Sequence, residues 1–338
     1  MKNIFRCYIG SSETTREASV FNFSSVLFNQ KSSKKEIKDK TVFFEWFIGF
    51  IEGDGSFAIK KFPTDKNSEN TRPYFIINQK DPKVLYKIKK KVGFGKVTFI
   101  PETEKNNAYH RYTVAKLEHI EWLIRFFNGN LLLTKVQNRF LEWVKCFNNL
   151  QALSNRPLLK FTPFLKEAED RVSLKSGWLA GFIDAEGGFY GALSKNKRFK
   201  TGYRERWKFY ITQKYERWLL FRIGELVEET AWKVLGFPSR PPSWKSSKHV
   251  MDLKKQANIY RLEIHRAESL KVLIDYLDSY RLLSKQDLVF TRWKRSILGK
   301  DGYRAQALLS KKGMRRYLRI FASIGAIHNR VSKNDEER

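Results

Sequence analysis

Cysteine is almost missing from this sequence, since Cys7 and Cys146 are the only two among 338 residues. Two thiols that far apart build neither a disulfide framework nor a zinc site, and their scarcity predicts a reducing compartment. The five histidines show no paired metal-ligand spacing, so we expect no tightly held transition metal. No uninterrupted apolar run is long enough to cross a bilayer, and no membrane partner is expected.

Acidic residues are the second shortage. Asp and Glu total 35 against 65 Lys and Arg, which gives a net charge of +30. An excess this large repels itself in a folded chain, so it indicates a polyanionic partner. Nucleic acid is the first candidate and a membrane surface the second. Because the basic residues are spread through the chain, not gathered on one helix face, nucleic acid is favoured.

The first 40 residues do not have the composition of a targeting segment. They contain Glu13 and Glu17, whereas organelle-import signals are poor in acids, and they lack a secretory apolar core. The chain is rich in Lys, Asn, Phe and Ile, which AT-rich codons encode. This composition is compatible with a gene that an organelle encodes, whose product needs no import signal.

The chain contains an internal duplication. Segments 44–57 and 176–189 match, with Asp54 and Glu186 equivalent at a separation of 132 residues. Three further landmarks recur downstream in the same order: 75–80 with 209–214, 112–118 with 260–266, and 133–143 with 283–293. Their separations differ slightly, as loops of unequal length would produce. The chain therefore consists of two homologous lobes.

The lobes share one predicted order of elements. Residues 43–54 and 176–186 are predicted to be helices, ended by Gly55 and Gly187 in the left-handed conformation. Alternation, clearest in 260–265, predicts strands. Helical spacing recurs near 82–92, 117–128, 134–147, 216–229, 266–278 and 284–297. The predicted domains are an N-terminal extension (1–40), a first lobe (41–150), a linker (151–172), a second lobe (173–298) and a basic tail (299–338), amphipathic around 315–324.

Small residues mark one face of the first helix in each lobe. Gly49 and Gly53 are four residues apart, and Gly181 and Ala185 repeat the spacing. Residues at this spacing lie on one helix face, and small ones allow another backbone to come very close. We therefore expect the two helices to pack against each other as the seam between the lobes, with their C-terminal ends together.

Asp54 and Glu186 occupy those C-terminal ends. A carboxylate there faces the negative end of the helix dipole, and two neighbouring carboxylates repel each other. A divalent cation would offset both penalties, and carboxylate sites suit Mg²⁺. The preceding residues, Gly53 and Ala185, are further candidate metal ligands. The alternative is that Asp-Gly and Glu-Gly are ordinary turn or cap dipeptides, which their duplication in matched context disfavours.

Residues 47–55 (FIGFIEGDG) and 179–187 (LAGFIDAEG) resemble the two motifs of the LAGLIDADG homing endonucleases. The resemblance covers residues 42–298. It implies an α+β fold of two pseudo-symmetric αββαββα lobes, each with an antiparallel sheet, which together form a DNA-binding saddle and join at a two-helix seam. It also implies that the penultimate acids, Asp54 and Glu186, bind metal, whereas Glu52 and Asp184 do not.

The resemblance implies further catalytic residues that the duplication retains in both lobes. Gln79 and Gln213 would lie near the attacking water, and Lys135 and Lys285 near the scissile phosphates. One such set per lobe suits a site that cuts two strands. The implied cofactors are two or three Mg²⁺ ions near those phosphates, with Mn²⁺ able to substitute and Ca²⁺ supporting binding without cleavage.

Strand faces supply the candidate DNA contacts. In the second lobe, alternation places long donors on one face and core residues on the other. The candidates are Ser56, Lys60, Arg72, Tyr74, Asn78, Arg111 and Thr113 in the first lobe, and Tyr190, Arg204, Arg206, Lys208, Tyr210, Thr212, Arg261, Glu263 and His265 in the second. The alternative for each is an ordinary exposed sheet position. Because the lobes differ at these positions, an asymmetric target is expected.

These features favour a monomeric, Mg²⁺-dependent endonuclease that breaks double-stranded DNA at a long asymmetric site, as in intron homing. The alternative is an RNA-binding maturase that assists splicing of its host intron, alone or in addition to cleavage. A pure splicing factor needs no metal pocket, so the acid pair distinguishes the two. A DNA-binding regulator on the same scaffold would bind its site without cutting. Composition and resemblance together indicate a mitochondrial protein, with the chloroplast as the alternative.

Overall fold

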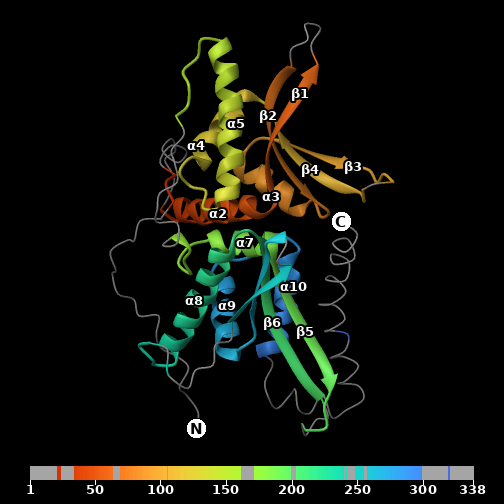
Figure 1. Cartoon of the computed structure of the whole chain (residues 1–338), viewed down its shortest axis with the longest axis vertical. Coiled ribbons are helices and arrows are strands. Elements are labelled where there is room, and N and C mark those ends of the chain that lie inside the picture. Colours follow the sequence, from red (N-terminus) through yellow and green to blue (C-terminus); the bar gives the residue numbers. More distant parts are fainter. Residues whose placement is uncertain are drawn as a thin grey trace.

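Two lobes lie end to end, and one helix from each runs between them (Figure 1). The computed structural model describes residues 21–23, 34–63, 69–104, 106–160, 171–198, 203–239, 241, 248–254, 257–298 and 319. The helices between the lobes are α2 (Lys34–Asp54) and α7 (Trp178–Glu186). The amphipathic stretch predicted around 315–324 lies outside the described residues, except for Arg319.

The first lobe continues from α2 with one antiparallel sheet and its covering helices. In order these elements are β1 (Gly55–Pro63), β2 (Glu69–Gln79), α3 (Lys83–Val92), β3 (Lys96–Ile100), β4 (Tyr109–Val114), α4 (Leu117–Phe127) and α5 (Thr134–Leu153). The strands are arranged β1-β2-β4-β3, and every neighbouring pair is antiparallel.

The second lobe repeats this order after α7. Its elements are β5 (Gly187–Lys195), β6 (Tyr203–Lys214), α8 (Arg217–Val234), β7 (Lys248–Lys254), β8 (Ile259–Ile264), α9 (Ala267–Ser279) and α10 (Gln286–Leu298). The strand order β5-β6-β8-β7 matches that of the first lobe. The predicted α+β class with two pseudo-symmetric lobes is therefore confirmed, and each lobe carries one more helix after the predicted αββαββα unit.

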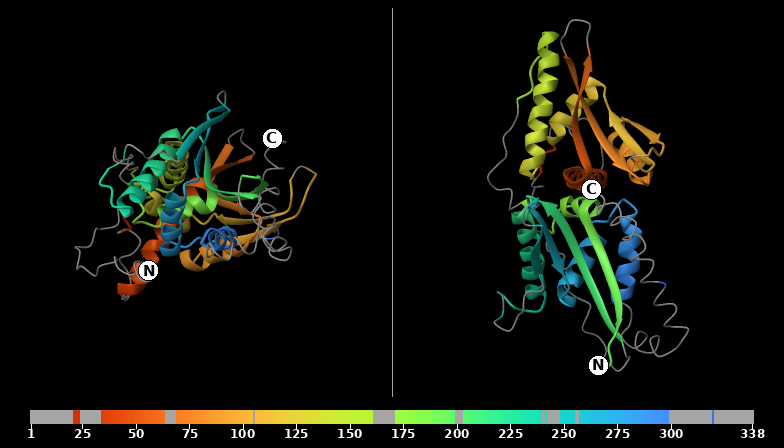
Figure 2. Two further views of the ribbon diagram at one scale, coloured as in Figure 1. Left: turned by 90° about the horizontal axis from the view of Figure 1, so that it is seen from below. Right: turned by 45° about the vertical axis from the view of Figure 1, so that its right-hand side comes forward.

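Alternation along the central strands fixes which sheet face is buried. Phe75 and Ile77 of β2 are fully buried, as are Phe209 and Ile211 of β6. Helices α5 and α8 lie on the same side of the molecule, with strands of both lobes beside them (Figure 2). Residues of the opposite strand parity lie on the face away from this core. Because the lobes lie end to end, the outer face of the first sheet and that of the second follow each other along the long axis of the molecule.

The seam is a contact between helix backbones. Every residue from 43 to 52 of α2 is buried, as expected for a helix surrounded by protein. A Cβ added to Gly49 would lie 2.0 Å from the Trp178 carbonyl oxygen, and one added to Gly181 would lie 1.8 Å from that of Trp46. No larger residue fits at either place. The small residues therefore stand where α2 and α7 come closest.

The expected left-handed conformation of Gly55 and Gly187 is wrong. Neither glycine has a positive φ, and Gly187 is extended at φ −81° and ψ 154°. The chain passes from α2 directly into β1 and from α7 directly into β5. Glycine is needed there for space, because an added Cβ would lie 2.7 Å from the carbonyl oxygen of Ile51 or Ile183.

Element boundaries also depart from the predicted ones. Helix α2 begins at Lys34, inside the predicted extension, and α5 continues to Leu153, inside the predicted linker. Part of the extension packs on the first lobe, where Phe23 is buried and stacks on Phe126. No helix of the described residues is both long and apolar enough to span a membrane.

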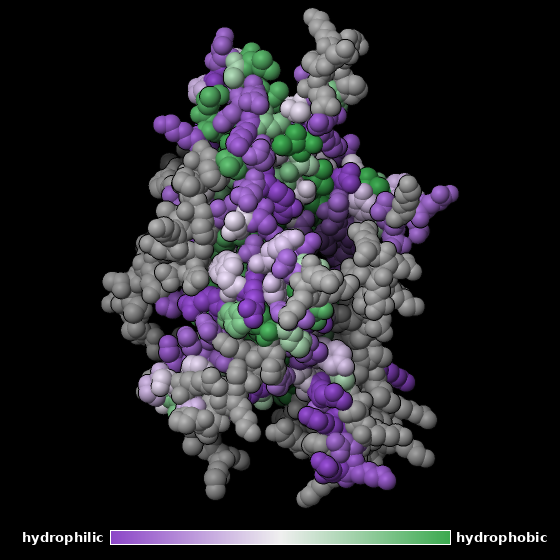
Figure 3. All heavy atoms as spheres, viewed as in Figure 1, coloured by the Kyte–Doolittle hydropathy of each residue, from purple (hydrophilic) through white to green (hydrophobic). Residues whose placement is uncertain are grey.

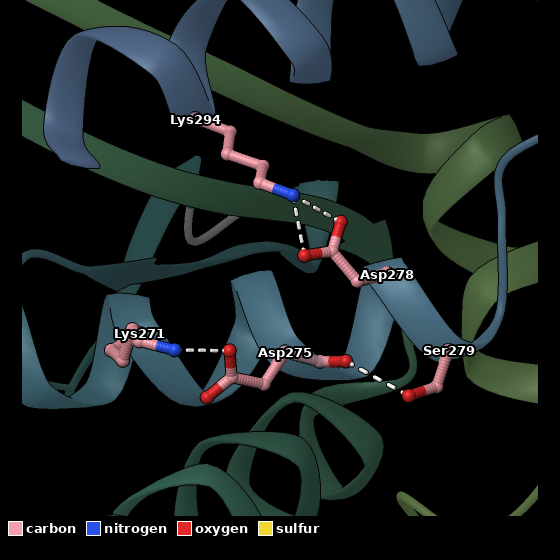
Figure 4. A network of polar contacts seen from close by, with 5 residues as sticks. All are labelled: Lys271, Asp275, Asp278, Ser279 and Lys294. Carbon is pink, nitrogen blue, oxygen red and sulfur yellow. Dashed lines mark hydrogen bonds and ion pairs between the residues drawn. The ribbon is translucent and has the colours of Figure 1, made fainter. Parts of the chain in front are cut away.

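An ion pair holds α10 against α9 (Figure 4). The Lys294 ammonium contacts both carboxylate oxygens of Asp278, one of them at 2.6 Å. Within α9 itself, Lys271 pairs with Asp275, and the Ser279 hydroxyl donates to the Asp275 carbonyl at 3.1 Å. The ion pair therefore joins the last two helices of the second lobe.

Candidate active site

Asp54 and Glu186 meet at the seam, where α2 and α7 end. Gly53 lies against the second of these acids: a Cβ on Gly53 would be 2.9 Å from Cγ of Glu186 and 3.6 Å from its Oε1. The same Cβ would be 2.5 Å from Cβ of Ala185. The flat face of α2 thus brings the two carboxylates into one small region.

The pKa of Asp54 is raised to about 8, chiefly by burial and also by the negative charges of Glu186 and Asp184. A hydrogen bond of 2.6 Å from Nε2 of Gln79 to Oδ2 of Asp54 opposes this shift. A carboxylate in such surroundings resists ionisation unless a positive charge arrives. The region is therefore electrostatically prepared for a cation.

The donors at this site are all oxygen atoms, which suits a hard divalent cation such as Mg²⁺. They are the two carboxylates, with the backbone carbonyls of Gly53 and Ala185 as the further ligands predicted from the sequence. No cluster of three or more His, Cys, Asp or Glu side chains able to hold a metal occurs within the described ranges. A metal held by the two carboxylates alone would keep positions for phosphate and water.

Lys135 reaches this region from the first turn of α5. Its Nζ donates to Oε1 of Gln213, at the end of β6 in the other lobe, at 2.9 Å. Burial lowers the pKa of Lys135, while the negative charges of Glu186 and Glu216 act in the opposite direction. The lysine of one lobe and the glutamine of the other therefore lie together. We call such a set of residues, proposed to serve one strand, a half-site.

Lys285 differs from its counterpart. It lies one residue before α10, its side chain is exposed, and its ammonium makes no polar contact in the described part of the chain. The structure thus brings together Asp54, Glu186, Gln79, Gln213 and Lys135, but it leaves Lys285 outside their contacts. Sequence spacing alone did not distinguish the two lysines.

Glu52 and Asp184 are not predicted to bind metal, and the structure gives them a different environment from the acid pair. Both are buried, and both accept backbone N–H groups of their own lobe and a tryptophan indole of the opposite one. Burial raises the pKa of Glu52 to about 7. The sequence signal that could have identified a role for these two acids is their recurrence in both motifs, two residues before each penultimate acid.

The candidate DNA contacts of the first lobe gather on one sheet face. Ser56, Ala58 and Lys60 of β1 stand opposite Ile76, Tyr74 and Arg72 of β2. The Lys60 ammonium lies over the Tyr74 ring, 4.4 Å from its centroid. Arg111 donates from Nε to Oδ1 of Asn78 at 3.0 Å across the β2–β4 pair. These cross-strand contacts hold long donors in fixed places.

The second lobe shows the same arrangement with different side chains. Arg261 donates to the Thr212 hydroxyl at 2.9 Å, which corresponds to the Arg111–Asn78 contact, and Lys208 pairs with Glu263 at 2.6 Å. Figure 3 shows hydrophilic residues along the β5–β6 hairpin in the lower lobe. A hollow of about 600 Å³ is lined by six of the candidate contacts, namely Tyr190, Arg204, Arg206, Lys208, Glu263 and His265.

The sequence is similar to those of known proteins. A family model described as LAGLIDADG endonuclease matches residues 47–147 and 179–297. A Neurospora crassa protein named "Probable intron-encoded endonuclease 4" is 30% identical over 250 residues, 73% of this chain and 38% of that protein. An intron-encoded RNA maturase of Saccharomyces cerevisiae is 29% identical over 189 residues, 53% of this chain and 26% of the maturase.

The fold also matches solved structures. The crystal structure of the I-LtrWI LAGLIDADG homing endonuclease bound to target DNA superposes with a TM-score of 0.58 at 18% identity, over 84% of this chain and 97% of that one. The resemblance drawn from the two motifs is thereby confirmed for the fold. Because the family model covers both lobes and more than half of the residues, the chain belongs to the LAGLIDADG endonuclease family.

Proposed function

We propose that this protein is a site-specific, divalent-metal-dependent DNA endonuclease that breaks both strands of a long asymmetric target, as intron homing requires. The observation that carries the proposal is the meeting of Asp54 and Glu186 at the ends of α2 and α7. Two neighbouring acids whose ionised forms are disfavoured by burial and by mutual repulsion are typical of functional sites. Gln79, Gln213 and Lys135 surround them with the donors that phosphodiester hydrolysis uses.

Mg²⁺ is the metal that this oxygen donor set fits best, with Mn²⁺ as a substitute. Asp54 and Glu186 would hold two or three ions with help from the carbonyls of Gly53 and Ala185. When bound, the metal supplies activation of the attacking water and neutralisation of phosphate charge. Ca²⁺ should support DNA binding without cleavage.

The chain's own residues orient and stabilise the reacting groups. Gln79 and Gln213 present amide groups beside the acids, where each can orient the attacking water. Lys135 places an ammonium beside Gln213, where it can stabilise the charge that develops on one scissile phosphate. Lys285, which is exposed, has the corresponding role on the other strand.

The proposed target is double-stranded DNA, because the net charge of +30 requires a polyanion and the outer sheet faces carry donors suited to the major groove. The two faces differ at most equivalent positions, although arginine recurs at Arg72 and Arg206 and at Arg111 and Arg261, and these differences support an asymmetric site. Both half-sites come from one chain, so the protein acts as a monomer. Its richness in Lys, Asn, Phe and Ile, which AT-rich codons encode, together with the family resemblance, supports a mitochondrial protein.

A duplex carrying the intronless insertion site tests the proposal. We expect double-strand cleavage with Mg²⁺ and binding alone with Ca²⁺. Asp54→Asn and Glu186→Gln should each slow cleavage by about a thousandfold or more, since the metal supplies several kcal/mol of charge stabilisation. Binding with Ca²⁺ should survive, and exposed Lys145→Ala serves as the control. Cleavage that persists in both acid variants would contradict the active-site assignment.

A second function, assistance in splicing, is supported by the similarity to the yeast maturase. It predicts specific binding of the host intron RNA and faster splicing in the protein's presence. Asp54→Asn should leave this activity intact, because the metal pocket serves cleavage. Equal affinity for unrelated RNA of the same length would count against this second function.

A further inference from the structure

Glu52 connects the first lobe to the helix of the second. One of its carboxylate oxygens accepts the backbone N–H groups of Leu132 at 2.6 Å and Leu133 at 2.7 Å. The other oxygen accepts the indole N–H of Trp178, on α7, at 2.6 Å. The first two bonds stay within one lobe and the third crosses the seam.

Asp184 repeats the arrangement with the lobes exchanged. It accepts the backbone N–H groups of Leu283 at 2.5 Å and Ser284 at 3.0 Å, together with the Ser284 hydroxyl. It also accepts the indole N–H of Trp46, on α2, at 3.2 Å. The shorter aspartate binds the turn one residue further along than the glutamate does, by the correspondence of Leu133 with Leu283.

The bound N–H groups lie where the lysine-bearing segments begin. Leu133 is the N-cap of α5, and Lys135 stands in its first turn. The Ser284 hydroxyl also accepts the backbone N–H of Gln286, which begins α10, and Lys285 lies between these two residues. The accepted N–H groups stand at or just before the N-cap, so each carboxylate holds the turn that enters the helix and faces the positive end of its dipole. Each acid thereby fixes the start of one helix.

We infer that Glu52 and Asp184 are positioning residues for cleavage, each of which fixes one lysine, Lys135 or Lys285, relative to the opposite lobe. The inference rests on the proposed function, because it takes these lysines to act at the scissile phosphates. It goes beyond that function in coupling the seam to the chemistry.

The tryptophans make this coupling specific to the seam. The residues whose indoles bind the acids, Trp178 and Trp46, also present the carbonyls that Gly49 and Gly181 approach. A change in helix packing would therefore move the lysine-bearing turns as well. Seam packing and lysine placement depend on the same side chains.

Positioning and simple stabilisation differ in their effect on the two strands. Glu52 fixes Lys135, which stands beside Gln213 and the charge of Glu186, so its loss should disturb that half-site. Asp184 should act on the half-site of Lys285. A residue that only stabilises the fold would slow both strands alike.

Cleavage of a duplex labelled separately on each strand measures both rate constants in Mg²⁺. Lys135→Met and Lys285→Met first identify the strand that each lysine serves. Glu52→Gln should then slow the Lys135 strand by about tenfold or more, since small misplacements near the reacting atoms have large effects, and leave the other strand much less affected. Asp184→Asn should produce the reverse bias.

Glu45→Gln is the matched control. The Glu45 carboxylate also crosses the seam, to the backbone N–H of Gly177 at 2.8 Å, but it begins no lysine-bearing helix. Its variant should keep the wild-type ratio between strands. Lysine variants without strand preference would contradict the proposed catalytic roles, whereas biased lysine variants with unbiased Glu52→Gln and Asp184→Asn would overturn the positioning inference.

A charge-conserving variant covers the case in which Glu52→Gln does not fold. Glu52→Asp keeps the carboxylate but shortens it by one methylene, so it should draw the start of α5 toward α2. We expect the same strand bias with a smaller amplitude. An unchanged strand ratio in Glu52→Asp and in Asp184→Asn would overturn the inference equally.

Discussion

Lys135 and Lys285 hold equivalent places in the two lobes but have different surroundings. The first is partly buried and donates to Gln213 of the opposite lobe, at 2.9 Å. The second is exposed, and its ammonium contacts no polar group among the described residues. Duplication supplied two matched sets of parts, and divergence has left one half-site assembled and the other open. The packing of the two lobes at the seam determines which residue of the opposite lobe each lysine contacts.

The motif acids differ in a related way. The first lobe carries the longer acid inside, at Glu52, and the shorter one at the helix end, at Asp54; the second lobe reverses this with Asp184 and Glu186. The inner acids still make the same two kinds of contact, with backbone N–H groups of their own lobe and with an indole N–H of the other lobe. Equivalent roles can therefore be kept by side chains of different reach when the turn they bind shifts by one residue.

Substitutions at the seam should have the largest effect on stability. Gly181→Ala places a Cβ 1.8 Å from the Trp46 carbonyl oxygen, where backbone on both sides must move, and should cost about 3 kcal/mol or more. Gly53→Ala meets Cβ of Ala185 at 2.5 Å, an atom fixed to the α7 backbone, and should cost about 2 kcal/mol, because the overlap is smaller than at Gly181. Urea unfolding measures both, and equal costs would contradict the backbone contact.

Double-mutant cycles sharpen the contrast between half-sites. Lys135→Met should slow one strand by about a hundredfold, as loss of a charge-stabilising group does. Its effect should be non-additive with Gln213→Ala, because the two side chains are bonded, whereas Lys285→Met and Gln79→Ala should be additive. Strand-resolved cleavage rates provide the energies. Coupling between Lys135 and Gln79 in place of Gln213 would contradict the cross-lobe pairing.

The pH dependence of stability tests the acid pair without metal. The pKa of Asp54, about 8, lies above its ordinary 3.8, so the folded state keeps a proton that the unfolded chain releases between these values. Stability from this group is therefore full below pH 3.8 and is lost as the pH rises through 8. Asp54→Asn cannot ionise, so in chelator its melting temperature relative to wild type should rise over that range.

Mg²⁺ should reverse this trend in the wild-type protein alone, because it binds the deprotonated carboxylate. The stabilisation by Mg²⁺ should therefore grow as the pH rises, and thermal melts with and without the ion measure it. A difference between wild type and Asp54→Asn that stays constant with pH would argue against a proton held at this site.

The smallest expected effect concerns the ion pair of α10. Lys294→Ala removes the contact with Asp278 and should lower the free energy of unfolding by at most about 1 kcal/mol, since both groups are partly solvated. Amide hydrogen exchange in α10 should increase while exchange in α5 stays unchanged. Lys145→Ala, which breaks a pair within α5, is the control for removal of a surface lysine.

Local patterns predicted most of the fold. Periodicity located the helices from α3 to α10, and alternation separated the buried from the exposed residues of β6 and β8. The strands β3 and β7 were not recognised individually, because they lie at a sheet edge, where only one neighbouring strand constrains the sequence. The conformation of Gly55 was mistaken because glycine after a helix serves two purposes, a left-handed turn or lack of a side chain, and sequence does not separate them.

The acid pair could be singled out because the duplication repeats it, and the glutamines because the resemblance implies them; their catalytic roles stay predictions. The contacts that organise them could not be foreseen, since they join residues far apart along the chain. Glu52 meets a turn 80 residues away, and Lys135 meets Gln213 across 78 residues and a lobe boundary. A repeat tells which residues are equivalent, but it does not tell which copy will face which.

At Gly55 and Gly187 the helix is followed directly by the strand, so no loop residues stand next to the acids that could let them move. The interval between the two reacting centres is therefore set by how closely two helix backbones can approach, a quantity that surface substitutions do not alter. The residues that would contact the bases stand on separate strands. We expect preference for a target to change by replacement of those side chains, while the offset between the two cuts stays constant.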